Sequence, residues 1–192
     1  MRFFFTEQKP FFRSITVFIW TISIVIAGCA PPADRYAPQI LTPPAIRTRQ
    51  IGTSVQGQPI DCIQFGYAGQ RVLVLAAIHG NEPASQVLAE ALREHLLRNR
   101  YLYSNRLILL IPVANPDGLS AGTRGNVNKI DLNRNFPADN RLNNTRFGTQ
   151  ALSEPESMAL YDLIEAENPA RIVSIHQPYG CIDYDGPAQI LS

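Results

Sequence analysis

The stretch Arg71–Glu82, RVLVLAAIHGNE, decides how the chain is expected to fold. From Arg71 to Ile78 it is almost continuously apolar, which is typical of a β-strand buried on both faces of a sheet. The run stops at His79-Gly80, and Pro83 suits the first turn of a helix. Apolar residues then recur at helical spacing over residues 84–97. The sequence therefore predicts a strand that delivers a histidine to the start of a helix.

Two later segments repeat this apolar pattern. Arg106–Val113 (RLILLIPV) and Arg171–Ile175 (RIVSI) predict two more buried strands, and the second leads directly into His176. Residues 58–65 have a weaker strand character. A helix is expected over residues 153–166, and its first residues, Ser-Glu-Pro-Glu, resemble a capping box.

The order of these segments predicts the fold class. Strands alternating with helices indicate an α/β fold with a mostly parallel or mixed open sheet and helices on both faces. Ligands of such sheets bind beyond the carboxyl ends of the strands. We therefore expect His79 and His176 to meet at one edge of the sheet. The domain that holds them is expected over residues 49–192.

The overall charge is close to neutral. The 192 residues hold 17 Lys+Arg and 16 Asp+Glu, for a formal net charge of +1. This balance gives no electrostatic reason to expect a nucleic-acid partner. With 45% hydrophobic residues, the chain is apolar enough to form a core.

The N-terminal residues are expected to be a targeting segment rather than part of the domain. Basic residues precede an apolar run over residues 15–27, and the run ends in Ile26-Ala27-Gly28-Cys29. This ending resembles a bacterial lipobox, which implies removal of residues 1–28 and lipidation of Cys29. The chain would then be exported and anchored in a membrane, facing the periplasm. A plain signal peptide or a signal anchor, in which Cys29 has no role, is the alternative.

A proline-rich segment follows. Residues 29–48 are expected to form a semi-rigid tether between Cys29 and the domain. Two cysteines remain beyond it, Cys62 and Cys181. They either pair in an oxidising compartment or are two buried thiols.

Three residues have the composition of a catalytic zinc site. His79 and Glu82 are three residues apart, and His176 follows a distant strand. Two histidines and one glutamate leave a fourth zinc position open for water or substrate. The alternative is a strand-end histidine bonded to backbone, with Glu82 as a favourable charge in the first helical turn.

A long polar stretch over residues 115–152 carries further motifs. It contains Asn115-Pro116-Asp117-Gly118, Thr123-Arg124-Gly125-Asn126 and Asp131-Leu132-Asn133-Arg134-Asn135-Phe136. With these motifs between the HxxE pair and the strand-end histidine, the sequence resembles the zinc carboxypeptidase family. The resemblance covers residues 79–182.

The resemblance implies a role for each matched residue. His79, Glu82 and His176 would bind one zinc ion. Arg124 would polarise the scissile carbonyl and stabilise the oxyanion. Asn133 and Arg134 would hold a substrate carboxylate, although an Asn/Arg-rich surface loop is the alternative for this pair. We interpret Asp117 and Asp131 as loop-shaping residues.

Further phrases resemble the murein peptide amidase branch of the family, among them Ala121-Gly122-Thr123-Arg124 and Ser174-Ile175-His176-Gln177-Pro178. The branch implies hydrolysis of the γ-D-glutamyl–meso-diaminopimelate bond of cell-wall peptides. The second amino acid centre of diaminopimelate would need its own polar contacts, for which Asp183 or Asp185 is a candidate, and a hairpin turn at Asp185-Gly186 is the alternative. Three other functions stay open. One is a non-catalytic lipoprotein that binds zinc or peptidoglycan peptides, another is an amide deacylase of the succinylglutamate desuccinylase type, and the third is a tethered structural lipoprotein without a ligand.

The family also implies a general base, a glutamate well beyond the second zinc histidine. In this sequence the last glutamate is Glu167. We therefore expect the C-terminal part of the catalytic domain to be missing from the 192 residues. A degenerate protein without turnover, or substitution by Asp183 or Asp185, are the alternatives.

Overall fold

The computed structural model describes residues 46–138 and 141–177. The expected signal peptide, Cys29, Cys181, Asp183 and Asp185 lie outside these ranges. Within them, the strands are β1 (Ile46–Thr53), β2 (Pro59–Phe65), β3 (Gln70–Ala76), β4 (Arg106–Ile111) and β5 (Arg171–Ile175). The helices are α1 (Pro83–Arg98), α2 (Pro116–Ala121) and α3 (Pro155–Glu167), with short 3-10 turns η1 (Arg100–Tyr103) and η2 (Leu132–Arg134).

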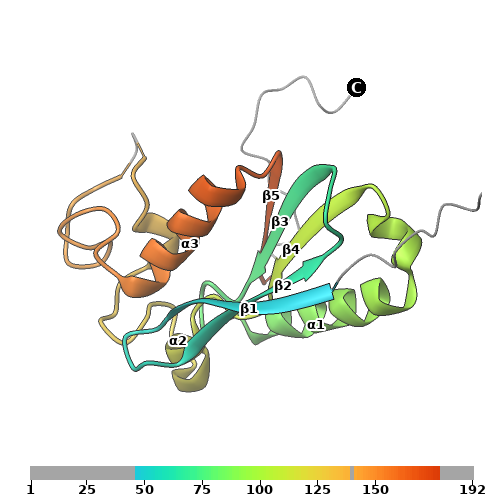
Figure 1. Ribbon diagram of the computed structural model, residues 1–192. Helices are drawn as coiled ribbons and strands as arrows, with labels where there is room; N and C mark the ends of the chain where they lie inside the picture. Colours follow the sequence, from blue (N-terminus) through green and yellow to red (C-terminus); the bar gives the residue numbers. More distant parts are fainter. Residues whose placement is uncertain (1–45, 139–140, 178–192) are drawn as a thin grey trace, which may run out of the picture. The chain divides into compact units, whose positions relative to one another are not determined.

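The strands form one mixed sheet in the order β1-β2-β4-β3-β5 (Figure 1). Strand β3 pairs in parallel with both β4 and β5, whereas β2 pairs antiparallel with β1 and with β4. The predicted α/β fold with a mixed open sheet is therefore confirmed. The long polar stretch after β4 is not structureless, because it contains α2 and η2.

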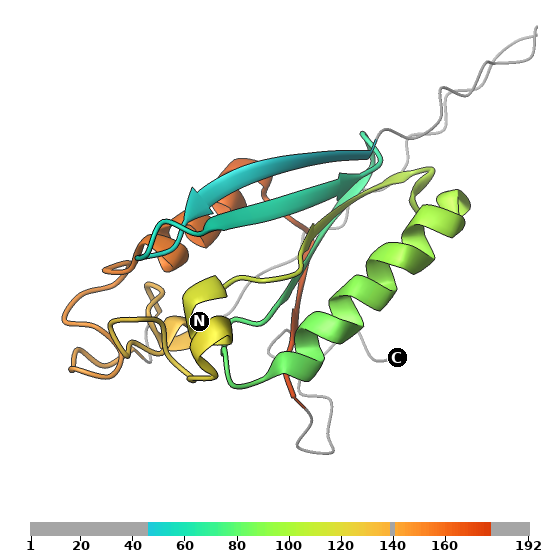
Figure 2. The ribbon, with the colours of Figure 1, turned by 90° about the horizontal axis from the view of Figure 1, so that it is seen from below.

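Helices cover both faces of this sheet, as predicted. Figure 2 shows α1 and α3 on opposite sides of the strands. Successive residues of β3 explain the two layers, because neighbouring side chains of a strand point to opposite faces. Leu73 and Leu75 pack in the core with Leu160 of α3. Val74 packs in a second core with Ala89 of α1.

Three details differ from the sequence-based expectations. The first strand, β1, begins at Ile46, ahead of the expected domain start at residue 49. It was not predicted because it is largely polar and carries no apolar signal. The predicted capping box of α3 is wrong, since the N-cap residue is Glu154 and its side chain makes no capping hydrogen bond. The burial expected for β5 is also wrong. Residues 171–174 are exposed because β5 is the outermost strand of the described sheet.

Cys62 lies on β2 and is fully buried. Burial raises the pKa of its thiol to about 11, although the nearby Arg49 opposes the shift. Cys181, the second cysteine of the possible disulfide, lies outside the described ranges, so the disulfide stays an open prediction.

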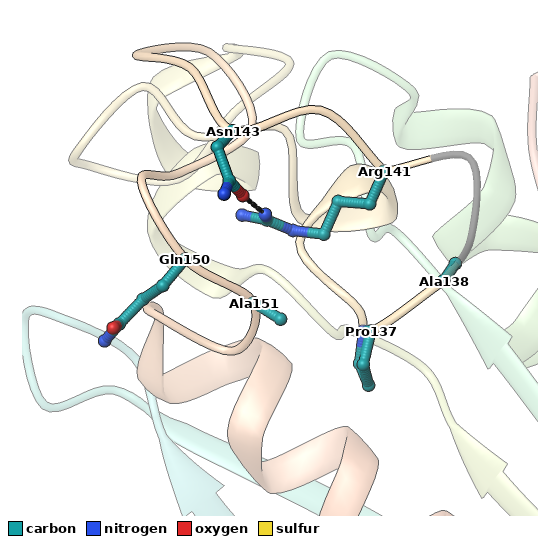
Figure 3. Close-up of a pocket in the computed structure, with 6 residues that line it drawn as sticks. All are labelled: Pro137, Ala138, Arg141, Asn143, Gln150 and Ala151. Atoms are coloured by element: carbon teal, nitrogen blue, oxygen red, sulfur yellow. Dashed lines mark hydrogen bonds between the residues drawn. The ribbon is translucent and has the colours of Figure 1, made fainter.

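The long loop also carries a shallow hollow (Figure 3). It is lined by Pro137, Ala138, Arg141, Asn143, Gln150 and Ala151. None of these residues was expected in a site. Across the described part of the chain, no helix has both the length and the hydrophobicity that crossing a membrane requires.

Candidate metal centre

The turn after β3 places His79 and Glu82 side by side. The backbone N–H of Ala77 donates to Ser85 Oγ at 3.0 Å, and Ser85 Oγ donates to the Glu82 carbonyl at 2.6 Å. The Glu82 N–H closes the turn on the His79 carbonyl at 3.1 Å. Pro83 then begins α1, as its missing N–H allows. These bonds hold both side chains at the carboxyl end of β3.

A glycine is needed at position 80 because the backbone of α2 packs against it and leaves no room for a side chain. A Cβ added to Gly80 would lie 1.9 Å from the carbonyl carbon of Gly118 in α2. Asn115 joins the same two segments, since its Nδ2 donates to the Ile78 carbonyl at 3.2 Å and its Oδ1 accepts from the Gly118 N–H at 2.9 Å. The HGNE and NPDG motifs are therefore packed against each other.

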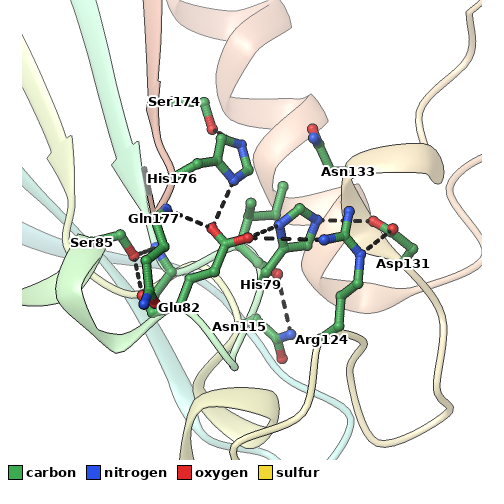
Figure 4. A network of polar contacts seen from close by, with 12 residues as sticks. His79, Glu82, Ser85, Asn115, Arg124, Asp131, Asn133, Ser174, His176 and Gln177 are labelled. Carbon is green, nitrogen blue, oxygen red and sulfur yellow. Dashed lines mark hydrogen bonds and ion pairs between the residues drawn. The ribbon is translucent and has the colours of Figure 1, made fainter. Parts of the chain in front are cut away.

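The structure brings His79, Glu82 and His176 together (Figure 4). One possible ligand atom from each residue lies within 4.8 Å of the others. Nδ1 of His79 is 2.9 Å from Glu82 Oε1, and Nδ1 of His176 is 2.9 Å from Glu82 Oε2. The pairing of Ala76 with Ile175 places the two strand ends side by side. The expectation that both histidines meet at one edge is met.

Burial shields this cluster from water. His79 is 3% exposed and Glu82 is 7% exposed, while His176 is half-buried. Burial alone would raise the pKa of Glu82. Hydrogen bonds from the Gln177 N–H, His176 and His79 outweigh it and lower the pKa below its ordinary value. Glu82 is therefore an ionised carboxylate.

Asp131 approaches His79 from the other side of the ring. Its Oδ1 is 3.1 Å from His79 Nε2, and its Oδ2 accepts from Arg124 Nε at 2.8 Å. Burial would raise the pKa of Asp131, but the contacts from His79 and Arg124 lower it to about 2. An ionised carboxylate can only accept, so Nε2 of His79 carries the proton that it donates to Asp131.

This proton placement defines what the cluster can bind. In a neutral His79 the lone pair of Nδ1 then points at Glu82, so two acceptors face each other at 2.9 Å. Such a pair is stable only when a cation or a proton lies between them. Two imidazole nitrogens and a carboxylate oxygen are a donor set that suits zinc. The residues present therefore fit a zinc ion, and the three predicted ligand roles are supported by this geometry.

Arg124 lies next to the triad. Its NH1 is 3.9 Å from Glu82 Oε1, and its bond to Asp131 holds the guanidinium in place. About a third of its side chain remains exposed (36%), so a substrate can reach the positive charge. This position is compatible with the predicted oxyanion role.

Asn133 and Arg134 follow Asp131 in η2. Asn133 is half-buried, and Figure 4 draws it beside the network without a polar contact to it. Arg134 is exposed, and its NH1 donates to the Asn133 carbonyl at 3.2 Å. Within the described residues, Arg134 forms no hydrogen bond with the triad. Its predicted contact to a substrate carboxylate stays a prediction.

The interpretation of Asp131 as a loop-shaping residue is wrong. It contacts His79 across 52 positions of sequence, a pairing that no local pattern indicates. Asp117 does shape a loop, because its Oδ2 accepts from the Gln56 N–H at 2.9 Å. Ser174 was also missed. Its Oγ is 3.1 Å from His176 Nε2, so each histidine has a polar partner behind it.

Comparison with known proteins agrees with this geometry. The family model described as zinc carboxypeptidase matches residues 38–184. Murein peptide amidase A of Escherichia coli strain K12 is 35% identical over 153 residues, which cover 71% of this chain and 61% of that protein. Gamma-D-glutamyl-L-diamino acid endopeptidase 1 of Lysinibacillus sphaericus is 28% identical, covering 69% and 46%. The chain thus spans about half to three fifths of the length of these relatives.

Solved structures show the same fold. The murein-tripeptide amidase of Escherichia coli O157 superposes with a TM-score of 0.56 at 30% identity, covering 70% of this chain and 62% of that one. Bovine thrombin-activatable fibrinolysis inhibitor, solved with a tick carboxypeptidase inhibitor, gives 0.60 at 21% identity, covering 68% and 53%, and supports the fold alone. Since the family model matches more than half of the residues, the chain belongs to the zinc carboxypeptidase family.

Proposed function

We propose that this protein is a zinc peptidase that hydrolyses an amide bond beside a free carboxylate, and that its substrate is the γ-D-glutamyl–meso-diaminopimelate bond of murein peptides. The observation that carries the proposal is the position of Arg124. Its guanidinium lies 3.9 Å from Glu82, beside a triad whose atoms suit zinc. A metal site with an adjacent, partly exposed cation can bind and polarise an amide carbonyl.

The residues would divide the work as follows. A zinc ion held by His79, Glu82 and His176 would supply Lewis-acid chemistry at the scissile carbonyl. Arg124 would stabilise the negative charge that develops on the carbonyl oxygen, and its bond to Asp131 fixes its direction beforehand. Asp131 and Glu82 are both engaged with histidine nitrogens, so the proton of the attacking water would pass to another base. The candidates are the glutamate that the family implies beyond His176, or Asp183 or Asp185, which lie outside the described residues.

Recognition of the substrate carboxylate is assigned to Asn133 and Arg134. Arg134 is exposed, and a guanidinium can bind a carboxylate through two parallel hydrogen bonds. Asn133 and Arg134 come two and three residues after Asp131 along the chain, which would place them near the expected scissile bond. The names of the two relatives, a murein peptide amidase and a γ-D-glutamyl-L-diamino acid endopeptidase, support this choice of substrate.

An assay for diaminopimelate tests the activity. The full-length protein would be loaded with one equivalent of zinc and incubated with the murein tripeptide L-Ala-γ-D-Glu-meso-diaminopimelate. We expect release of free diaminopimelate, with none from a Glu82→Gln variant. No release by zinc-loaded protein would contradict the proposal. Tight binding of the tripeptide in a calorimeter without release would instead favour a non-catalytic peptide-binding protein.

We also propose that the protein is exported and anchored by a lipid on Cys29, which would place the site where murein peptides occur. The proposal rests on the apolar run over residues 15–27 and the lipobox-like Ile26-Ala27-Gly28-Cys29. Growth with labelled palmitate should label the wild-type protein and leave Cys29→Ala unlabelled. Equal labelling of both, or labelling of neither, would contradict it.

A further inference from the structure

A buried polar cluster joins the loop between Arg124 and Asp131 to the start of α3. Asn126 is 2% exposed, Glu154 is 5% exposed and Glu156 is fully buried. The Nδ2 group of Asn126 donates to Glu154 Oε2 at 2.7 Å and to Glu156 Oε2 at 3.1 Å. Two carboxylates at the start of α3, one at its N-cap and one in its first turn, thus share one amide. None of these three residues contacts the triad in the described structure.

The other end of the Asn126 amide shapes the loop. Its Oδ1 accepts from the Asn128 N–H at 3.1 Å and from the Ile130 N–H at 3.2 Å. A primary amide offers two donor hydrogens and two acceptor lone pairs. Asn126 therefore uses its whole hydrogen-bonding capacity between the loop and α3.

Asn126 closes a turn that lies between Arg124 and Asp131. The Asn126 N–H donates to the Ile130 carbonyl at 3.1 Å. Arg124 precedes this turn and Asp131 follows it, and the two side chains meet at 2.8 Å. The spacing of Arg124 from Asp131, and of Asp131 from His79, therefore depends on the shape of this turn.

Glu154 and Glu156 join the turn at Asn126 to a helix that is held in the core. Leu160 and Leu163 of α3 pack in the same core as β3, so the start of this helix cannot move without disturbing the sheet. Glu156 also accepts from the Val55 N–H at 3.1 Å, which joins the β1–β2 turn to the cluster. Asn128 adds a second link, because its Nδ2 donates to Glu154 Oε2 at 2.8 Å.

We infer that Asn126, held by Glu154 and Glu156, is a positioning residue that sets Arg124 and Asp131 against the metal-binding His79. This inference rests on the proposed function and deepens it. Asn126 touches neither the predicted zinc ligands nor the expected substrate position, so its effect passes through the turn. Groups behind metal ligands commonly change metal affinity by about 10- to 100-fold when they are altered.

An isosteric substitution of Asn126 changes its hydrogen bonds and keeps the shape of its side chain. Asn126→Asp keeps the oxygen that accepts from the loop but turns the donor toward α3 into an acceptor. That new oxygen would replace the Asn126 Nδ2, which is 2.7 Å from Glu154 Oε2. Two buried carboxylates without a donor between them repel each other. In the double variant Asn126→Asp/Glu154→Gln, the new glutamine amide donates to the carboxylate at position 126 and restores one of the two contacts. The contact with Glu156 Oε2, now 3.1 Å, stays without a donor.

Asn144→Asp is the matched control. Asn144 lies in the same long loop, and its Oδ1 accepts from the Arg146 N–H at 2.9 Å and the Phe147 N–H at 2.8 Å. It is exposed and has no bond to Glu154 or Glu156 in the described structure. The substitution therefore makes the same Asn→Asp change in a loop turn where no carboxylate faces the side chain and which lies outside residues 124–131.

The test measures metal binding by the full chain. Zinc affinity would be measured by competition with a chromophoric chelator, the visible spectrum after Co²⁺ loading would report the ligand geometry, and thermal unfolding of metal-free protein would report stability. For Asn126→Asp we expect zinc affinity to fall about tenfold and the Co²⁺ spectrum to shift. The double variant should recover part of the affinity, and Asn144→Asp should match wild type.

Two outcomes would overturn the inference. One is Asn126→Asp protein that is less stable but binds zinc and Co²⁺ like wild type, which would make the cluster a scaffold only. The other is no recovery in a folded double variant. If Asn126→Asp does not fold, Asn128→Asp decides, with a zinc affinity at least threefold below wild type in support and an unchanged affinity against. Wild type that binds no zinc would instead refute the proposed function.

Discussion

Asp131 and His79 are 52 positions apart in the sequence, and their side chains lie 3.1 Å apart in the structure. The contact fixes the proton of His79 on Nε2 and turns Nδ1 toward Glu82 and His176. The same carboxylate holds Arg124 at 2.8 Å. One buried aspartate therefore orients both a predicted metal ligand and the predicted oxyanion group.

Replacing this carboxylate should weaken metal binding. For Asp131→Asn we expect zinc affinity to fall about tenfold or more, because an uncharged amide has one acceptor oxygen and cannot accept from both His79 and Arg124. Chelator competition on folded protein measures the change. Asp117→Asn is the control, since Asp117 is a buried carboxylate that accepts from the Gln56 N–H. Equal zinc affinity in wild type and Asp131→Asn would show that His79 does not depend on Asp131.

The sequence predicted the elements that carry strong periodicity and missed contacts that depend on tertiary packing. Strands β3 and β4 were predicted because their apolar runs reflect burial on both faces. Strand β5 shares that pattern but is exposed, since hydrophobicity does not reveal which strand is outermost. The site histidines were predicted from strand ends. Asp131 was missed because an aspartate in a loop looks the same whether it shapes a turn or faces a distant histidine.

The contact between the HGNE and NPDG motifs predicts a strong effect at Gly80. Gly80→Ala would place a methyl group 1.9 Å from the Gly118 carbonyl carbon, and backbone on both sides cannot easily move. We expect a loss of roughly 3 kcal/mol or more in the free energy of unfolding, measured by denaturant titration. Gly57→Ala meets no atom within 4 Å but has a φ of +78°, so it should cost only about 1 kcal/mol. Similar losses for the two variants would argue against the close packing of these motifs.

Cys62 predicts a pH dependence of stability at alkaline pH. Its thiol pKa is raised from 9.0 to about 11 by burial, so the folded state favours the protonated thiol. The resulting stabilisation is complete below about pH 9 and is lost as the pH rises through about 11. The difference in unfolding free energy between wild type and Cys62→Ala should therefore shrink across this window. A constant difference from pH 8 to pH 11 would mean that the thiol is not buried as described.

Arg124 and Arg134 should affect different kinetic constants if the proposed peptidase activity is correct. Arg124→Gln removes a charge beside the reacting carbonyl, so kcat should fall by roughly 100- to 1,000-fold. Arg134→Gln removes an exposed cation assigned to the substrate carboxylate, so KM should rise while zinc affinity is unchanged. Steady-state kinetics on the murein tripeptide separates the two. A reversed assignment, with KM controlled by Arg124 and kcat by Arg134, would contradict the roles proposed for them.

The central claim is that His79, Glu82 and His176 hold one zinc ion. X-ray absorption spectroscopy of the zinc-loaded chain tests it most directly. We expect one zinc per chain with nitrogen and oxygen ligands at about 2.0–2.2 Å, two of them imidazoles, and loss of this signal in His79→Ala and His176→Ala. A sulfur ligand at about 2.3 Å, or an unchanged zinc environment in both variants, would contradict the account.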